Sequence, residues 1–288
     1  MDTMASVSEH RIYRVTSIGR PVEPKYPTNK AILLLMPVAA LIAGVVNLIQ
    51  AAAGGSGATS PVVAFLVVFG GWALGRELAP DDNSAAFVGT ALAFIGLWWW
   101  PSPSLLLLFT ALSLSRIVNR STGLTARPSD SVIVTSLVIW TMVSLQNPLL
   151  GVVAALVFSL DARLEEPNRR QWLFAAACLT AVGVQVWLIG SDSLAVTVLP
   201  EPQSVIAAVT LLAFLALSLR LRTVSSKGDV GGLVLNAWRV RGGMLVVWLL
   251  ALQTGLQGPG AIEALMPVLA AMAGVVLAAL AGRFLASR

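Results

Sequence analysis

Long apolar segments alternate with short polar turns from residue 31 to the end of the chain. A helix that crosses a bilayer needs about 20 mainly apolar residues, within a range of about 17–25. Most of the apolar segments have this length or approach it, so the pattern predicts membrane-spanning helices. The ten predicted spans are residues 31–53, 61–78, 84–100, 104–118, 131–147, 148–160, 171–189, 204–221, 242–257 and 261–285.

The composition agrees with this pattern. Apolar residues make up 57% of the chain and charged residues only 11%, with a mean hydropathy of +0.82. Soluble proteins carry about 25% charged residues, because water must solvate their surface. We therefore expect an all-α polytopic integral membrane protein in which residues 31–288 form a single transmembrane helical domain and residues 1–30 an N-terminal tail.

The basic residues indicate how the chain is oriented. All nineteen Lys and Arg residues fall in the tail, at alternate turns or at the C-terminal end. The other turns contain none of them; these are residues 54–60, 101–103, 147–148, 190–203 and 258–260. Of the fourteen acidic residues, three fall on the side without basic residues: Asp192, Glu201 and Glu263. Because cytoplasmic turns carry an excess of Lys and Arg, both termini are predicted to lie in the cytoplasm, with the spans in the inner or plasma membrane of the cell.

The segment 131–160 admits two interpretations. Residues 148–160 form a helix of only about 20 Å, shorter than the hydrocarbon core of about 30 Å. The first interpretation is ten spans, and the alternative is eight spans plus a re-entrant hairpin at 131–160. Both keep Arg127 and Arg163 on the cytoplasmic side, so charge does not separate them. A single helix kinked at Pro148 is less favoured, because it moves Arg163 to the outside.

Several kinds of site are disfavoured by composition. Cys178 is the only cysteine and His10 the only histidine, so neither a disulfide framework nor a Cys/His metal site is expected. We predict no metal and no cofactor. The basic residues lie in short turns without a basic helix or a stacking platform, so nucleic acid is not an expected partner. The expected partner is the lipid bilayer.

Amide side chains gather at the outer ends of the predicted spans. If these helices converge, the amides line a polar vestibule that is open to the outside and binds substrate. The alternative is hydrogen bonding near the lipid headgroups. The candidate substrate-binding residues are Asn47, Gln50, Gln146, Asn147, Gln185 and Gln253.

Three cytoplasmic turns share one arrangement. Each has an Arg near the end of a span, then a proline (Pro80, Pro128 or Pro167), then a polar residue that can cap the next helix. The structural interpretation is a helix stop followed by a cap. The functional alternative is a cytoplasmic pocket in which carboxylates and Arg hold Mg²⁺ and a diphosphate. Its residues would be Arg76, Glu77, Asp81, Asp82, Arg120, Asp161, Arg163 and Glu165.

Small residues recur every four positions in two spans. Gly71 and Gly75 form one such step, and residues 270, 274, 278 and 282 form a longer run. Small side chains let helix backbones approach closely in lipid. We expect packing within the chain, with a homodimer or a membrane-protein partner as the alternative.

Three functions fit these features. The format of ten short-looped helices with both ends inside resembles that of drug/metabolite-type transporters in length and topology. We therefore expect a transporter for a small-molecule or lipid-like substrate. The alternatives are a structural or accessory membrane subunit, because nothing in the chain demands chemistry, and a membrane enzyme acting on a lipid or prenyl phosphate. No ionisable residue lies near the middle of a predicted span, which disfavours proton coupling through a buried carboxylate.

Overall fold

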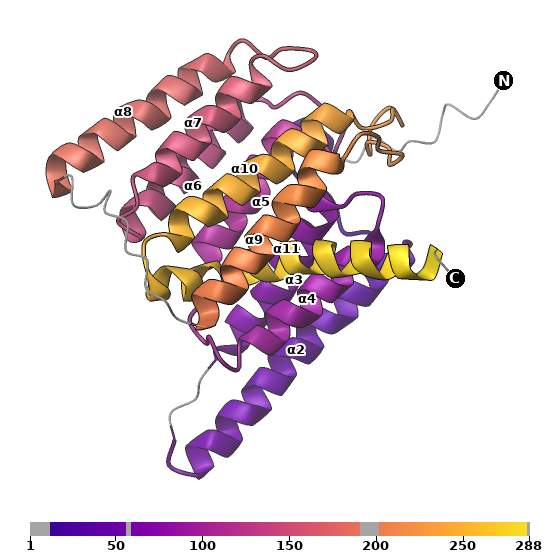
Figure 1. The fold of residues 1–288 in the computed structure, drawn as a ribbon, viewed down its shortest axis with the longest axis vertical. Helices are drawn as coiled ribbons and strands as arrows, with labels where there is room; N and C mark the ends of the chain where they lie inside the picture. Colours follow the sequence, from indigo (N-terminus) through magenta and orange to yellow (C-terminus); the bar gives the residue numbers. More distant parts are fainter. Residues whose placement is uncertain (1–11, 56–58, 191–201, 287–288) are drawn as a thin grey trace. The chain divides into compact units, whose positions relative to one another are not determined.

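The computed structural model describes residues 12–55, 59–190 and 202–286, and within these ranges the regular structure is helical apart from one isolated bridge between Lys227 and Val234. Figure 1 shows the helices in chain order. They are α1 (Ile12–Val15), α2 (Pro27–Ala52), α3 (Pro61–Leu78), α4 (Asn83–Gly96), α5 (Leu105–Asn119), α6 (Pro128–Ser144), α7 (Leu149–Asp161), α8 (Gln171–Ile189), α9 (Pro202–Arg220), α10 (Ala237–Gly255) and α11 (Pro259–Ala286).

The helices from α2 to α11 coincide one for one with the ten apolar segments predicted from the sequence, and α3 and α8 match at both ends. Five of them are long and apolar enough to cross a membrane, namely α2, α3, α8, α9 and α11. The helices α4, α5, α6 and α7 are apolar but shorter. Large apolar side chains of α8 are exposed, such as Leu173, Trp187 and Leu188, as expected where lipid replaces water as the solvent.

The segment 131–160 is a helical hairpin rather than one kinked helix. The chain leaves the helical conformation after Ser144, and Gln146 has a positive φ of 50°. The Asn147 side chain then accepts from the Leu149 amide at 3.1 Å and starts α7. As a result α7 packs back along α6, and both helices pack against α8.

The expected helix caps form in one of the three cytoplasmic turns. Asp82 caps α4 by accepting from the Ser84 amide at 2.9 Å. The prediction is wrong for α6 and α8, whose N-cap residues Arg127 and Arg170 make no side-chain cap. At α6, Pro128 is the first helical residue, so one of the amides that lack a partner at a helix start is absent.

The chain divides into two compact units. The first contains Met1–Pro21, Ser113–Ala195 and Arg220–Val247, and the second contains Val22–Leu112, Val196–Leu219 and Trp248–Arg288. In the first unit α6, α7 and α8 lie side by side (Figure 1). In the second unit α2, α3, α4 and α11 pack against one another, with a core that includes Ala64, Ala93 and Met266.

Small residues set the closest approach within the second unit. A Cβ added to Gly75 would lie 2.7 Å from the Cα of Ala86, and one added to Gly274 would lie 2.4 Å from the backbone nitrogen of Gly89. The small-residue runs of α3 and α11 therefore both face α4, as expected for packing within the chain. Gly282, at the end of the α11 run, has nothing within 4 Å of such a Cβ.

Candidate functional site

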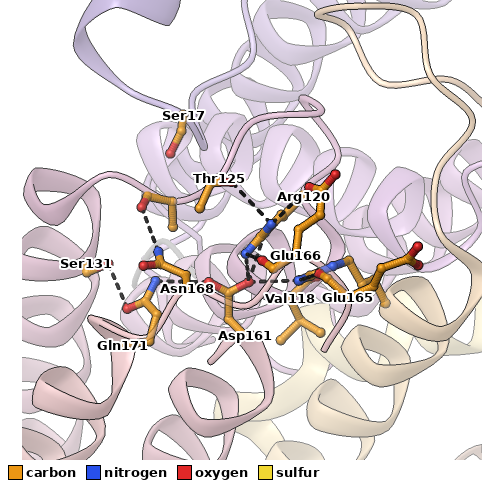
Figure 2. A network of polar contacts seen from close by, with 12 residues as sticks. Ser17, Val118, Arg120, Thr125, Ser131, Asp161, Glu165, Glu166, Asn168 and Gln171 are labelled. Carbon is orange, nitrogen blue, oxygen red and sulfur yellow. Dashed lines mark hydrogen bonds and ion pairs between the residues drawn. The ribbon is translucent and has the colours of Figure 1, made fainter. Parts of the chain in front are cut away.

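Asp161 is the centre of a buried polar cluster in the first unit, shown in Figure 2. Its Oδ1 accepts from the Arg120 Nε at 2.9 Å and from the Arg239 Nη1 at 2.8 Å. Its Oδ2 accepts from the Gln171 Nε2 at 3.2 Å. Asp161 has no exposed surface, and Arg120 and Arg239 are 6% and 4% exposed. Asp161 and the Glu166 carboxylate, which lies 3.6 Å from Arg120, together balance the two guanidinium groups, which would be costly to bury alone.

Backbone carbonyls and the Thr125 hydroxyl, which accepts from Arg120 at 3.2 Å, take further Arg hydrogens. Arg120 donates to the Glu166 carbonyl at 3.0 Å. Arg239 donates to the Val118 carbonyl at 3.1 Å and to the Glu165 carbonyl at 2.5 Å. These bonds join the end of α5, the end of α7 and the start of α10. Because the charges are compensated and hydrogen-bonded, the cluster has the features of a structural brace.

The N-terminal residues 12–20 are also held by carboxylates of this unit. Asp130 accepts from the Thr16 hydroxyl at 2.6 Å and from the Ser17 amide and hydroxyl at 2.7 and 2.5 Å. Asp229 accepts from Arg20 at 2.6 and 2.7 Å and from the Tyr13 hydroxyl at 3.1 Å. This part of the predicted tail is therefore docked on the first turn of α6 and on the segment before α10. The rest of the tail, residues 1–11, lies outside the described residues.

The predicted acid and Arg residues fall into two groups. Arg120, Asp161 and Glu165 belong to the first unit, as does Arg163, whose guanidinium lies 5.1 Å from the ring of Trp172. Two residues of this cluster were not predicted from the sequence. Arg239 binds Asp161, and Asn236 donates to the Glu165 carboxylate. A signal was present, since Arg239 is one of two Arg residues directly before the apolar segment that begins at Gly242.

The other four candidates belong to the second unit. Arg76 donates to the Asn29 Oδ1 at 3.3 Å and lies 5.2 Å from the ring of Trp72. Glu77 is 2% exposed, Asp81 is exposed, and Asp82 caps α4. Among the described residues, no three His, Cys, Asp or Glu side chains are grouped so that they could hold a metal ion. A single pocket that combines all eight residues stays a prediction.

Two of the predicted amides, Gln146 and Gln185, line the same groove. This groove lies between α6 and α8 and has a volume of about 540 Å³, which is in the range of about 300–1,000 Å³ usual for small-molecule sites. Its wall is apolar except for Gln146, Gln185 and Thr180. None of the described residues that line it is charged.

Gln185 has one amide atom left over for a ligand. Its Nε2 donates to the Met142 carbonyl at 3.0 Å. A carbonyl only accepts, so this bond sets the orientation of the amide. The Gln185 Oε1 is buried and accepts no hydrogen bond from any described residue. An unsatisfied buried acceptor costs about 1–3 kcal/mol, a cost that a bound donor would remove.

The remaining amides have other surroundings. Asn147 is buried and starts α7, as described above. Asn47, Gln50 and Gln253 belong to the second unit. There Asn47 donates to the Thr59 carbonyl at 2.7 Å, and Gln253 donates to the Thr254 hydroxyl at 2.7 Å. Convergence of all six amides on one vestibule stays a prediction.

The basic residues divide the turns into two groups, those with Lys or Arg and those without. The hydrogen bonds below each join two turns of the same group. In the first unit, turns with basic residues bond to one another, for example Asn168 to the Ala126 carbonyl at 3.0 Å and the Val230 amide to the Thr122 carbonyl at 2.9 Å. In the second unit, turns without basic residues do so. The Ser102 amide donates to Glu263 at 3.1 Å, and the Thr59 hydroxyl donates to the Leu97 carbonyl at 3.2 Å.

The length and apolar character of the helices are those of a helical membrane protein. No protein-family model, curated protein or solved structure matches the chain.

Proposed function

We propose that the chain is a ten-span membrane protein, with both termini in the cytoplasm, that transports a small-molecule or lipid-like substrate. The observation that carries the proposal is the α6–α8 groove, because it combines an apolar wall with a buried amide oxygen that no described residue satisfies. Sites for small molecules usually have this composition, with a few placed polar groups in a mainly apolar cavity.

The geometry of the first unit supports ten spans over eight. At the start of α8, Gln171 bonds to Ser131 and to Asp161, which lie at the two ends of the hairpin. At the other end of α8, Ile189 and Gln146 line the same groove. Because Gln185 also bonds to Met142, the hairpin accompanies α8 from Gln171 to Gln185, or about 21 Å at 1.5 Å per residue. If α8 crosses the bilayer, the hairpin crosses with it.

An accessory membrane subunit is the second candidate, supported by the Asp161 cluster. Every charge of that cluster already holds protein groups, so it resembles a brace more than a reaction centre. The same engagement gives the lipid-phosphate enzyme less support, because a carboxylate that already accepts from three side chains has little capacity left for Mg²⁺.

Transport can be measured in liposomes that contain the purified protein. The probe is a neutral single-chain glycoside with a nitrobenzoxadiazole fluorophore on its chain, whose sugar crosses a bare bilayer slowly because its hydroxyls lose water. Dithionite added outside quenches probe that reaches the outer leaflet. We expect the protein to accelerate this transfer and Gln185→Leu to slow the protein-dependent rate about tenfold.

The matched control is Gln257→Leu, which removes an amide of the other unit that is not among the six candidates. It should leave the rate within about twofold of the original protein. Equal rates for liposomes with and without protein would contradict transport of this substrate class. Equal rates for the two variants would remove the groove from the mechanism.

A further inference from the structure

The α6–α8 groove has the dimensions of one lipid chain. It runs along α8 from Ala177 to Ile189, a rise of about 18 Å at 1.5 Å per residue. One leaflet contributes about 15 Å to the hydrocarbon core of a bilayer. The groove is therefore about as long as the chain of a lipid that lies parallel to the helix.

The polar groups of the groove are placed unevenly. The Thr180 hydroxyl donates to the Ala176 carbonyl at 3.0 Å, so its hydrogen is used within α8. Gln185 and Gln146 lie toward the ends of α8 and α6. One hydrogen of the Gln185 Nε2 is donated to Met142, and the Oε1 is the atom of this amide that no described residue satisfies. This end of the groove therefore offers an unsatisfied acceptor to a hydrogen-bond donor.

From these features we infer that the groove binds a neutral, single-chain amphiphile whose hydroxyl group donates to the Gln185 Oε1. The chain lies between α6 and α8, and the hydroxyl lies at the Gln146 end. The amide turns about its last side-chain bond to present the Oε1 to the hydroxyl, and the new hydrogen bond replaces the one that the Nε2 gives to the Met142 carbonyl. The inference deepens the proposed transport function and rests on it for its biological meaning.

Charge complementarity favours this occupant over a phospholipid. Proteins recognise phosphate through Arg, Lys and backbone amides, and none of the described residues lining the groove is Arg or Lys. A carboxylate ligand is disfavoured for a second reason. It carries no hydrogen to donate, and its charge would approach the lone pairs of the Oε1 in an apolar environment.

The test uses two probes on the purified full-length protein in phosphatidylcholine nanodiscs. One is a long-chain primary alcohol with a photoreactive diazirine on its chain, and the other is its methyl ether, which lacks the donor. After illumination, peptide mass spectrometry locates the label, and competition by unlabelled alcohol or ether measures affinity. We expect labelling of α6 and α8 near Val143 and Val184, with the alcohol about tenfold tighter than the ether.

The Gln185→Met variant should abolish this preference while it retains labelling, because Met keeps the length of the side chain and removes the acceptor. Thr180→Val is the matched control and should keep the preference. Equal affinity of alcohol and ether for the original protein would overturn the inference without need of a variant. So would labelling that only phospholipid suppresses, or cross-links between two copies of the chain. Selective binding without accelerated transfer in liposomes would contradict transport and leave the binding inference standing.

Discussion

Asp161 has no exposed surface, and its two oxygens accept hydrogen bonds from three side chains that come from three different segments. Arg120 follows α5 with a positive φ of 49°, Gln171 begins α8 and Arg239 lies in the first turn of α10. A single carboxylate thus determines how the ends of several helices of the first unit meet. Removing its charge would leave Arg239 without its carboxylate partner and Arg120 with only the exposed Glu166 carboxylate, 3.6 Å away.

We predict that Asp161→Asn destabilises the protein by about 3–5 kcal/mol, the usual cost of leaving a buried ion pair without one partner. Asn has nearly the same shape as Asp, so the loss of stability would come from the missing charge and not from altered packing. The measurement is the free energy of unfolding in detergent, followed by tryptophan fluorescence during denaturant titration.

Asp82→Asn is the matched control for this change. It alters a carboxylate at another cytoplasmic turn, where Asn caps a helix about as well as Asp, so stability should change by less than about 0.5 kcal/mol. A loss for Asp161→Asn no larger than that of the control would contradict the brace.

At the scale of helices, α4 and α11 approach so closely that their backbones touch. A Cβ on Gly274 would lie 2.4 Å from the nitrogen of Gly89 and 2.6 Å from the carbonyl oxygen of Ala85. Both of these are backbone atoms, which cannot turn aside as a flexible side chain can. In lipid, no hydrophobic force drives helices together. They pack tightly where small residues let their backbones come into direct contact.

Gly274→Ala should therefore force α4 and α11 apart and cost about 1–3 kcal/mol. Gly282→Ala is the control on the same helix face, where nothing lies within 4 Å of the added carbon. Because Ala has a higher helix propensity than Gly, this substitution should leave the stability unchanged or raise it by up to about 1 kcal/mol. Melting temperatures in detergent compare the two, and size-exclusion chromatography with light scattering tests dimerisation. Equal melting temperatures would refute close packing, and a change of mass for Gly282→Ala would favour the dimer.

For the whole molecule, the sorting of turns predicts which residues face the outside of the cell. Ser102 lies in a turn without basic residues, Ser129 follows the α5–α6 turn that carries Arg120 and Arg127, and Ser144 ends α6. All three side chains are exposed, whereas the single native cysteine, Cys178, is buried. Cysteines introduced at these positions can therefore report the topology.

In a Cys178→Ala background, a membrane-impermeant maleimide should label S102C and S144C in intact cells and S129C only after the membrane is permeabilised. Labelling of S102C without S144C would favour the eight-span alternative, because the tip of a re-entrant hairpin does not reach the outer surface. Labelling of S129C alone would reverse the proposed orientation.

The positions of the helices were predictable from the sequence, and part of the site was. Apolar length and turn residues are local properties, so α3 and α8 were predicted at both ends. Gln146, Gln185, Arg120 and Asp161 were recognised as candidates because polar residues are rare in such a chain. Their partners were not predicted, since Arg239 lies 78 positions from Asp161 along the chain.

The sequence by itself determined that this chain forms apolar helices separated by turns and that its basic residues belong to alternate turns. These properties follow from segment length and composition, which each part of the chain carries independently of the others. Only the tertiary structure decided that Asp161 braces two Arg side chains, that α4 receives the small faces of α3 and α11, and that Gln185 shares a groove with Gln146. Such contacts depend on which helix faces meet, and short turns with a hydrophobic period common to all helices leave many pairings open.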